Sequence, residues 1–175
     1  MQRCALLLGA CLVIAAAGCG GTKTVTKTVT VSETAKTGVG PPGDIVEFGH
    51  VKSLTRKGNG FVMRFDPEWF LSGVTANTAA AEDGNVPPGE PVPNDNYRVD
   101  EGQRLLTYLV PANAQVTVLT KGANLTGTPI TVAQLAQIVE GKNPLPHPLF
   151  EPITTGFWIQ IHIDTVRSLK QQYIP

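Results

Sequence analysis

The sequence predicts an α+β fold, a small antiparallel β-sheet or partly open barrel of about six strands with two helices. Three observations lead to this prediction. Residues 157–163 alternate in side-chain character as a half-buried strand does. Residues 131–141 repeat apolar side chains at helical spacing, between a threonine and a glycine that suit the two ends of a helix. Glycine- and proline-containing turns divide the other apolar segments, so neighbouring segments are expected to pair as hairpins.

The folded part is expected to be one domain over residues 44–175, long enough for a single core. Its first hairpin joins a strand over 45–55 to a strand over 61–65. The glycines of residues 56–60 let the chain reverse between them.

A helix is expected to follow the first hairpin. Asp66 and Pro67 favour a turn that continues through 69–71, and Ser72 is the expected N-cap of a helix that ends at Gly84. Residues 85–101 carry four prolines, which predict a long but stiff loop.

Two more hairpins are expected in the second half of the domain. Strands over 104–110 and 115–120 form one, and strands over 157–163 and 166–174 form the other. A loop over 121–128 and an amphipathic helix capped by Thr131 lie between the hairpins. In the strand over 157–163, the expected inward residues are Phe157, Ile159, Ile161 and Ile163.

The N-terminus has the pattern of an export signal over residues 1–18. Arg3 supplies a positive charge, and the apolar run that follows ends at Ala17. This run is too short for a helix that spans a bilayer, which needs about 20 residues. Small residues at the end of the run suit a signal peptidase.

The residues Ala16-Ala17-Gly18-Cys19 resemble the lipobox of bacterial lipoproteins, although the lipobox usually has leucine where this chain has Ala16. The resemblance implies that Cys19 receives a diacylglycerol and that the domain is anchored outside the cytoplasm at the cell membrane. Ala15-Ala16-Ala17 also fits an ordinary Ala-x-Ala cleavage site, so a secreted protein is the alternative, as is an uncleaved anchor.

Residues 19–43 are expected to be a tether between the lipidated cysteine and the domain. Threonine and valine alternate in this segment as in a strand, but glycines flank it and the repeat contains no turn that would supply a partner strand. A flexible chain of this length has a root-mean-square reach of about 27 Å.

The cysteines and the charge limit the function. Every cysteine lies at or before Cys19, so the domain can form no internal disulfide and no cysteine metal site. The 14 basic and 14 acidic residues balance, and they form no basic cluster, which argues against a nucleic-acid partner.

Three segments of the domain resemble exported domains of uncharacterised lipoproteins from high-GC Gram-positive bacteria. They are residues 65–84, Pro93 to Tyr97, and Gln172 to Pro175. The resemblance implies a location at the cell envelope and no particular reaction or cofactor.

No motif in the sequence indicates catalysis or a metal site. The serines lack a Gly-x-Ser-x-Gly elbow, and the histidines lack the spacing of a zinc pair. Asp83 and Asp95 offer oxygen ligands of the type that calcium prefers, but their spacing does not match an EF-hand and suits turns equally well. We therefore expect no catalytic residues, no metal and no cofactor.

Four residues are the candidate ligand-binding residues: Trp158, His162, Asp95 and Tyr97. Trp158 and His162 project from the strand face opposite the isoleucines, so Trp158 either packs under the helix over 131–140 or lies exposed as a binding platform. The expected function is a non-enzymatic binding or structural module whose partner is an envelope protein or polymer. The alternatives are an envelope hydrolase with a carboxylate pair and a calcium-dependent sensor.

Overall fold

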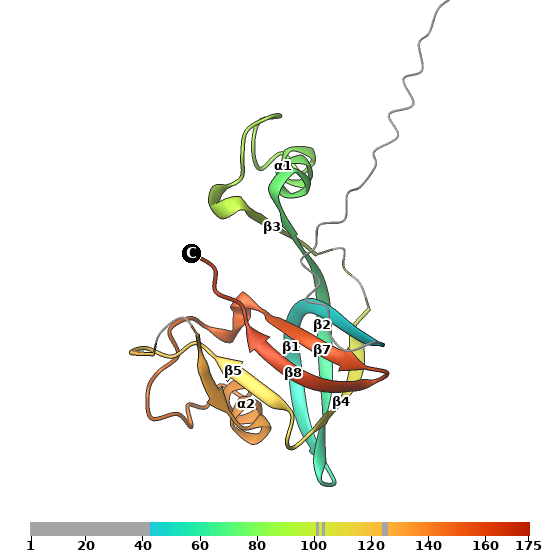
Figure 1. The fold of residues 1–175 in the computed structure, drawn as a ribbon, viewed down its shortest axis with the longest axis vertical. Coiled ribbons are helices and arrows are strands. Elements are labelled where there is room, and N and C mark those ends of the chain that lie inside the picture. Colours follow the sequence, from blue (N-terminus) through green and yellow to red (C-terminus); the bar gives the residue numbers. More distant parts are fainter. Residues whose placement is uncertain (1–42, 101, 103, 124–125) are drawn as a thin grey trace, which may run out of the picture. The chain divides into compact units, whose positions relative to one another are not determined.

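The computed structural model describes residues 43–100, 102, 104–123 and 126–175. The expected signal peptide, Cys19 and the tether up to residue 42 lie outside these residues. The elements, in chain order, are β1 (Asp44–Lys57), β2 (Gly60–Ser72), α1 (Gly73–Glu82), η1 (Pro93–Asp95), β3 (Asn96–Val99), β4 (Leu106–Pro111), β5 (Gln115–Val118), β6 (Thr128–Ile130), α2 (Val132–Val139), η2 (Ile153–Thr155), β7 (Phe157–His162) and β8 (Thr165–Gln171) (Figure 1).

The α+β class and the two helices agree with the sequence prediction, but the sheet is larger and differently paired. The expected hairpin of strands 104–110 and 115–120 is wrong, because β4 pairs with β2 and β8 whereas β5 pairs with β6 and β8. It has eight strands in the order β3-β2-β1-β7-β8-β5-β6, and β4 pairs with both β2 and β8. The sheet is mixed because β8 runs parallel to β4 and β5. A single bridge between Leu109 and Thr165 joins β4 to β8, so the sheet is partly ringed without being a barrel.

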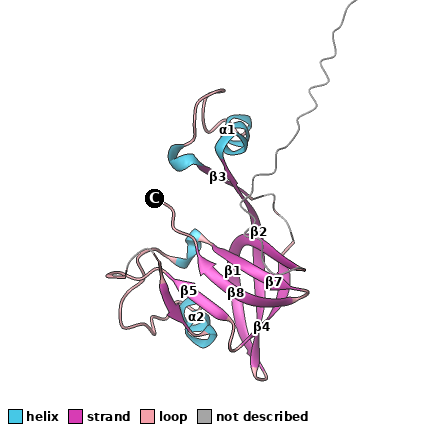
Figure 2. Ribbon diagram, viewed as in Figure 1, coloured by secondary structure: helices cyan, strands magenta, loops and turns pink. Residues whose placement is uncertain are grey.

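The core lies on the inner face of this curved sheet. Helix α2 lies against β1 and β5 (Figure 2), and its Val132 and Leu135 are fully buried. Burial of large aliphatic and aromatic side chains is the main stabilising contribution in the described residues, which contain no cysteine. The largest fully buried side chains include Met63, Phe65, Leu135, Phe157, Ile159, Ile161 and Leu169.

Strand β2 is longer than the sequence indicates. The turn expected through residues 69–71 is wrong, because the strand continues past Asp66 and Pro67 to Ser72. Pairing with β4 ends at Phe65 and pairing with β3 begins at Trp69, so at Pro67 the strand pairs with β1 alone. A proline, which has no backbone N–H to donate, is tolerated where one side of the strand is unpaired. Residues 69–72 then pair with β3, which the sequence analysis assigned to a loop. Strands β3 and β6 were both missed because they are only four and three residues long.

Gly49 allows β1 and β2 to approach closely where β2 continues. A Cβ atom at this position would lie 2.1 Å from the backbone oxygen of Asp66 and 2.8 Å from Cα of Pro67. No side chain fits there, which explains a glycine in the middle of a long strand.

The ends of the two helices agree with the sequence to different degrees. Thr131 forms a complete capping box with Gln134. Ser72 is the N-cap of α1 but forms no side-chain cap hydrogen bond; Oδ1 of Asp95 instead accepts from the backbone N–H of Gly73 at 3.1 Å. The expectation that Ile163 faces the core is wrong, because it lies in the β7–β8 turn and is 77% exposed. Among the described residues, none of the helices has the length and apolar character needed to cross a bilayer.

Candidate binding groove

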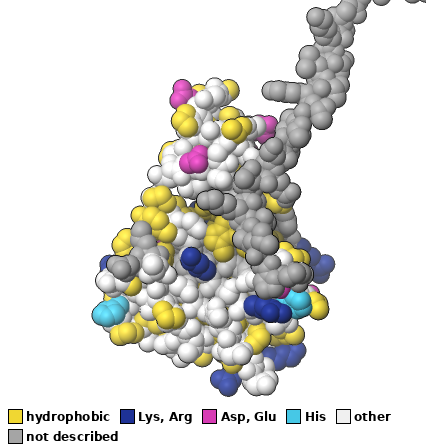
Figure 3. All heavy atoms as spheres, in the orientation of Figure 1, with side chains coloured by type: hydrophobic (Ala, Val, Ile, Leu, Met, Phe, Trp, Pro, Cys, Tyr) yellow, Lys and Arg dark blue, Asp and Glu magenta, His cyan; other side chains and the backbone are white. Residues whose placement is uncertain are grey.

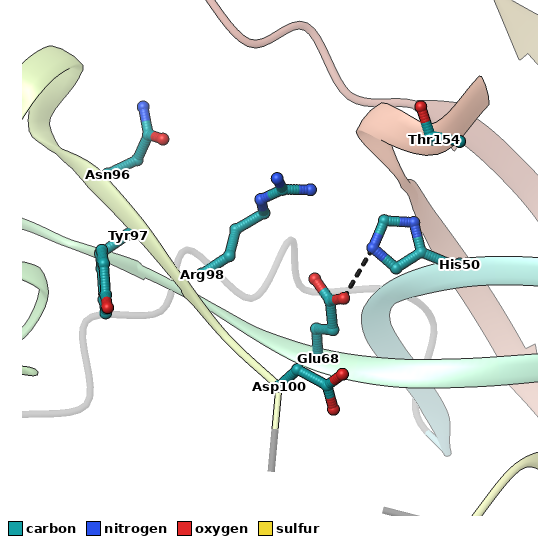
Figure 4. Close-up of a pocket in the computed structure, with 7 residues that line it drawn as sticks. All are labelled: His50, Glu68, Asn96, Tyr97, Arg98, Asp100 and Thr154. Atoms are coloured by element: carbon teal, nitrogen blue, oxygen red, sulfur yellow. Dashed lines mark ion pairs between the residues drawn. The ribbon is translucent and has the colours of Figure 1, made fainter. Parts of the chain in front are cut away.

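Strand β3 forms one wall of an open groove with a volume of about 560 Å³. We call it the β3 groove; it is lined by His50, Glu68, Asn96, Tyr97, Arg98, Asp100 and Thr154. Alternation along a strand places Asn96 and Arg98 on one face of β3 and Tyr97 on the other. Figure 4 shows Arg98 extending on the side of the His50–Glu68 pair, with Tyr97 pointing the other way. The groove therefore presents polar and charged groups from three strands and η2.

An ion pair occupies the side of the groove opposite β3. Nε2 of His50 lies 2.7 Å from Oε1 of Glu68, and both side chains are mostly buried. Asp100 follows the end of β3 and is exposed, so the groove holds two carboxylates, one of which is paired with an imidazole (Figure 4). The guanidinium of Arg98 adds a planar set of donors that suits a carboxylate or phosphate.

The η2 turn, which carries Thr154, is fixed to the sheet by Gln171. This side chain is 3% exposed, and its Oε1 accepts from the backbone N–H of Leu119 at 2.9 Å. Its Nε2 donates to the backbone oxygens of Glu151 and Pro152, each at 3.2 Å. A buried and fully paired amide of this kind holds a proline-rich segment in one position. Thr154 consequently faces the groove from a rigid support.

An aromatic layer lies beside the groove, on the same face of the sheet. Phe48 lies 4.9 Å from Phe70 and 5.2 Å from Trp158, measured between ring centroids. Phe70 is the cross-strand partner of Arg98. The indole N–H of Trp158 donates to Oε1 of Gln172 at 2.7 Å. Trp158 is thus half-buried against two phenylalanines, and the expectation that it packs under the helix over 131–140 is wrong.

Tyr97 and Asp95, two of the predicted binding residues, serve the attachment of α1. The hydroxyl of Tyr97 donates to Oδ2 of Asp83 at 2.8 Å, just past the end of α1. This hydrogen bond raises the pKa of Tyr97, and partial desolvation adds to the effect. Asp95 accepts from Gly73 at the start of α1. Only Tyr97 lines the β3 groove.

His162 belongs to a different part of the domain. Its Nδ1 lies 2.8 Å from Oδ1 of Asp44, whose side chain is fully buried. It lines a second groove of about 660 Å³, which we call the seam groove because it lies beside the single bridge between β4 and β8. The lining comes from the β4–β5 turn, Leu109 and residues 162–167. The structure therefore does not bring the four predicted binding residues together.

Sequence reasoning missed the charged residues of the β3 groove. His50, Glu68 and Arg98 are far apart in the chain, and each taken alone has the pattern of a surface residue. One sequence pattern could have indicated strand β3, because polar and apolar side chains alternate from Asn96 to Asp100. It would have placed Arg98 and Asp100 on one face.

Comparisons with protein-family models, curated proteins and solved structures found no match to this chain. Within the part of the chain that the structure describes, no group of three or more histidine, cysteine or acidic side chains is arranged to hold a metal ion. The groove geometry is therefore the basis for the functional argument.

Proposed function

We propose that this chain is an exported lipoprotein, anchored to the cell membrane through Cys19, whose domain binds a component of the cell envelope in the β3 groove. The observation that carries the proposal is the position of Arg98 beside the His50–Glu68 ion pair. A guanidinium next to carboxylates, an amide and a hydroxyl can recognise a ligand that carries both anionic and hydrogen-bonding groups.

The chemistry of the lining favours an envelope polymer with polar groups over a protein partner. Protein interfaces are usually centred on apolar or aromatic side chains that become buried. Phe48 and Phe70 do not line the β3 groove but pack against each other beside it, and the lining residues are polar or charged. An open polar groove of this size fits a segment of a chain-like ligand.

The binding proposal is tested by photocrosslinking in the protein's own cells. A photoreactive residue in place of Thr154, which is exposed at the groove, is expected to form an adduct with polymer rather than with protein. Arg98→Ala should lower the adduct yield about tenfold, the effect of losing one charge-assisted contact. Arg104→Ala is the matched control, because Arg104 is also exposed but does not line the groove. Equal yields from both variants would contradict the proposal.

The anchor is tested separately. Mass spectrometry of the purified protein should find a diacylglycerol on Cys19, and Cys19→Ser should release the chain from the membrane fraction. An unmodified Cys19 would contradict the proposed anchor but not the proposed binding in the β3 groove.

An envelope hydrolase is the second candidate, because Glu68 and Asp100 lie in one groove with a histidine. Paired carboxylates can act as acid and base on a glycosidic bond. Purified protein would then release soluble fragments from a cell-wall preparation, and Glu68→Gln would abolish the release.

A further inference from the structure

The β7–β8 turn contains an isoleucine in an unfavourable position. Ile163 has a φ of +56°, a region that β-branched residues rarely adopt, and its side chain is 77% exposed. Glycine or asparagine would fit this backbone without strain. The turn thus retains a large apolar side chain that contributes nothing to the core and strains the backbone.

Ile163 lines the seam groove, and a second exposed apolar side chain, that of Leu109, lines it as well. Leu109 is 52% exposed, and its backbone N–H donates to the backbone oxygen of Asp164 at 2.9 Å, next to Ile163. Both side chains line the seam groove together with Pro111 and Ala114. These apolar side chains lie among polar ones, which include Asn113, Gln115 and His162. The charged groups at the groove are the acidic Asp164 and Asp44 and the basic Arg167.

The seam groove lies where the N-terminal segment joins the domain. Asp44, the first residue of β1, is the cross-strand partner of His162, and His162 directly precedes Ile163. The segment that leads back to Cys19 therefore enters the domain beside the exposed isoleucine. A lipid at Cys19, about 25 residues away, would keep this end within a few nanometres of the bilayer.

Charged residues are unevenly distributed along the first half of the domain. No acidic residue occurs between Phe48 and Phe65, a stretch that carries Lys52, Arg56, Lys57 and Arg64. Residues 66–100, in contrast, contain seven acidic residues and one basic residue. On the face that Figure 3 shows, most of the visible acidic side chains lie over the part that contains α1 and β3, whereas the visible Lys and Arg side chains lie over the rest of the domain.

Basic residues approach the seam groove from two sides. Arg64 donates to Oγ1 of Thr107 at 2.6 Å, and Thr107 is two residues from Leu109 on the same strand. Arg167 lines the groove itself and is 52% exposed, although its Nε lies 3.9 Å from Oδ1 of Asp44. Apolar side chains flanked by cations are the pattern by which peripheral proteins bind anionic bilayers.

We propose that the seam groove docks on the anionic surface of the membrane, with Ile163 and Leu109 entering the headgroup region. This inference rests on the proposed anchor at Cys19 and identifies the bilayer as a second partner of the domain. The lipid and the apolar side chains act together, because stable attachment to a bilayer usually needs two weak signals. The acidic segment 66–100 is repelled by the same surface, so docking turns it toward the envelope.

The test uses the full chain reconstituted through its own anchor into phosphatidylcholine vesicles that contain phosphatidylglycerol and a headgroup-level quencher lipid. A fluorophore at Asn113→Cys, on the rim of the seam groove, should be quenched. A fluorophore at Val74→Cys, which is 82% exposed at the start of α1, should not be quenched. Ile163→Asn should reduce the quenching at position 113 by at least half, because asparagine accepts positive φ but is polar.

Three outcomes separate the explanations. In the first outcome, the protein sediments with the vesicles, but the fluorophores at positions 113 and 74 are quenched equally or not at all. This result overturns the docking inference and leaves the anchor intact. Protein that fails to sediment with vesicles overturns the anchor and the docking together. Quenching that depends on protein concentration indicates a second copy of the chain in the groove and also overturns the inference.

The charge requirement has its own control. Arg64→Gln with Arg167→Gln should lower the quenching at position 113 in anionic vesicles, and added salt should do the same. Neither change should affect pure phosphatidylcholine vesicles. Val74→Asn, which removes an equally exposed apolar side chain elsewhere, should leave the quenching unchanged.

Discussion

The hydroxyl of Tyr108 on β4 donates a hydrogen bond of 2.8 Å to Oε2 of Glu47 on β1. Tyr108 packs against the main core, and its ring lies 6.2 Å from that of Phe65. Burial raises the pKa of Tyr108, and the hydrogen bond to the Glu47 carboxylate raises it further. The neutral hydroxyl is therefore part of the folded state.

This pKa shift predicts a loss of stability at alkaline pH. A tyrosine whose pKa is raised by folding stabilises the fold fully below its unfolded pKa of about 10, and the stabilisation falls as pH rises above that value. Unfolding in urea between neutral and strongly alkaline pH should show this decline, and Tyr108→Phe should reduce its slope. Glu47→Gln should retain most of the slope, because burial is the larger cause. Equal slopes in the native protein and Tyr108→Phe would count against this assignment.

Gly49→Ala should destabilise the domain strongly. The new methyl group would overlap the backbone of Asp66, and the strands can separate only by breaking their pairing. We expect a loss of about 3 kcal/mol in the free energy of unfolding, at the upper end for overpacking. Gly60→Ala is the control: its nearest neighbour, the Val110 oxygen, is 3.1 Å away, so a smaller loss is expected. If the two variants had the same urea midpoint, the close approach of the strands at Gly49 would not be the cause of the lost stability.

The helix caps should respond differently to the same substitution. Thr131→Ala removes half of a capping box and should cost about 1 kcal/mol. Ser72→Ala removes no cap hydrogen bond and should cost much less. Asp95→Ala should cost more than Ser72→Ala, since Asp95 accepts from the first N–H of α1. Thermal unfolding of the three variants gives the order, and a larger effect at Ser72 than at Asp95 would refute it.

The tryptophans should differ in their accessibility to solvent. Trp69 is 52% exposed, whereas Trp158 is packed between Phe48 and Phe70. Acrylamide should therefore quench a Trp158→Phe protein, which retains Trp69, more strongly than a Trp69→Phe protein. Trp158→Phe should also cost about 1 kcal/mol through loss of the bond to Gln172. The reverse order of quenching would show that the aromatic layer is open.

Ile163→Gly should stabilise the domain even though it removes the residue proposed to enter the membrane. Left-handed backbone costs a residue with a Cβ about 1–2 kcal/mol, and glycine avoids this cost while losing some entropy. We expect a net gain of about 0.5 kcal/mol in chemical unfolding of the unlabelled protein. A loss of stability would indicate that the side chain contributes to packing in the fold.

Local patterns were sufficient for much of the fold. The hairpin of β1 and β2, the hairpin of β7 and β8, and the capped helix α2 are all formed by neighbours in the chain, and each has a periodicity or turn that is visible in one short window. The short strands β3 and β6 have too few residues to show a reliable period.

By itself, the sequence determined the α+β class, the helix positions and the absence of cysteines from the domain, because these depend on composition and on side chains close in the chain. Only the tertiary structure decided the parallel pairing of β8, the partial ring and the β3 groove. His50, Glu68 and Arg98 meet because β1, β2 and β3 are neighbours in the sheet. Such neighbours are selected by burial and pairing over long sequence separations, which leave no local periodic pattern.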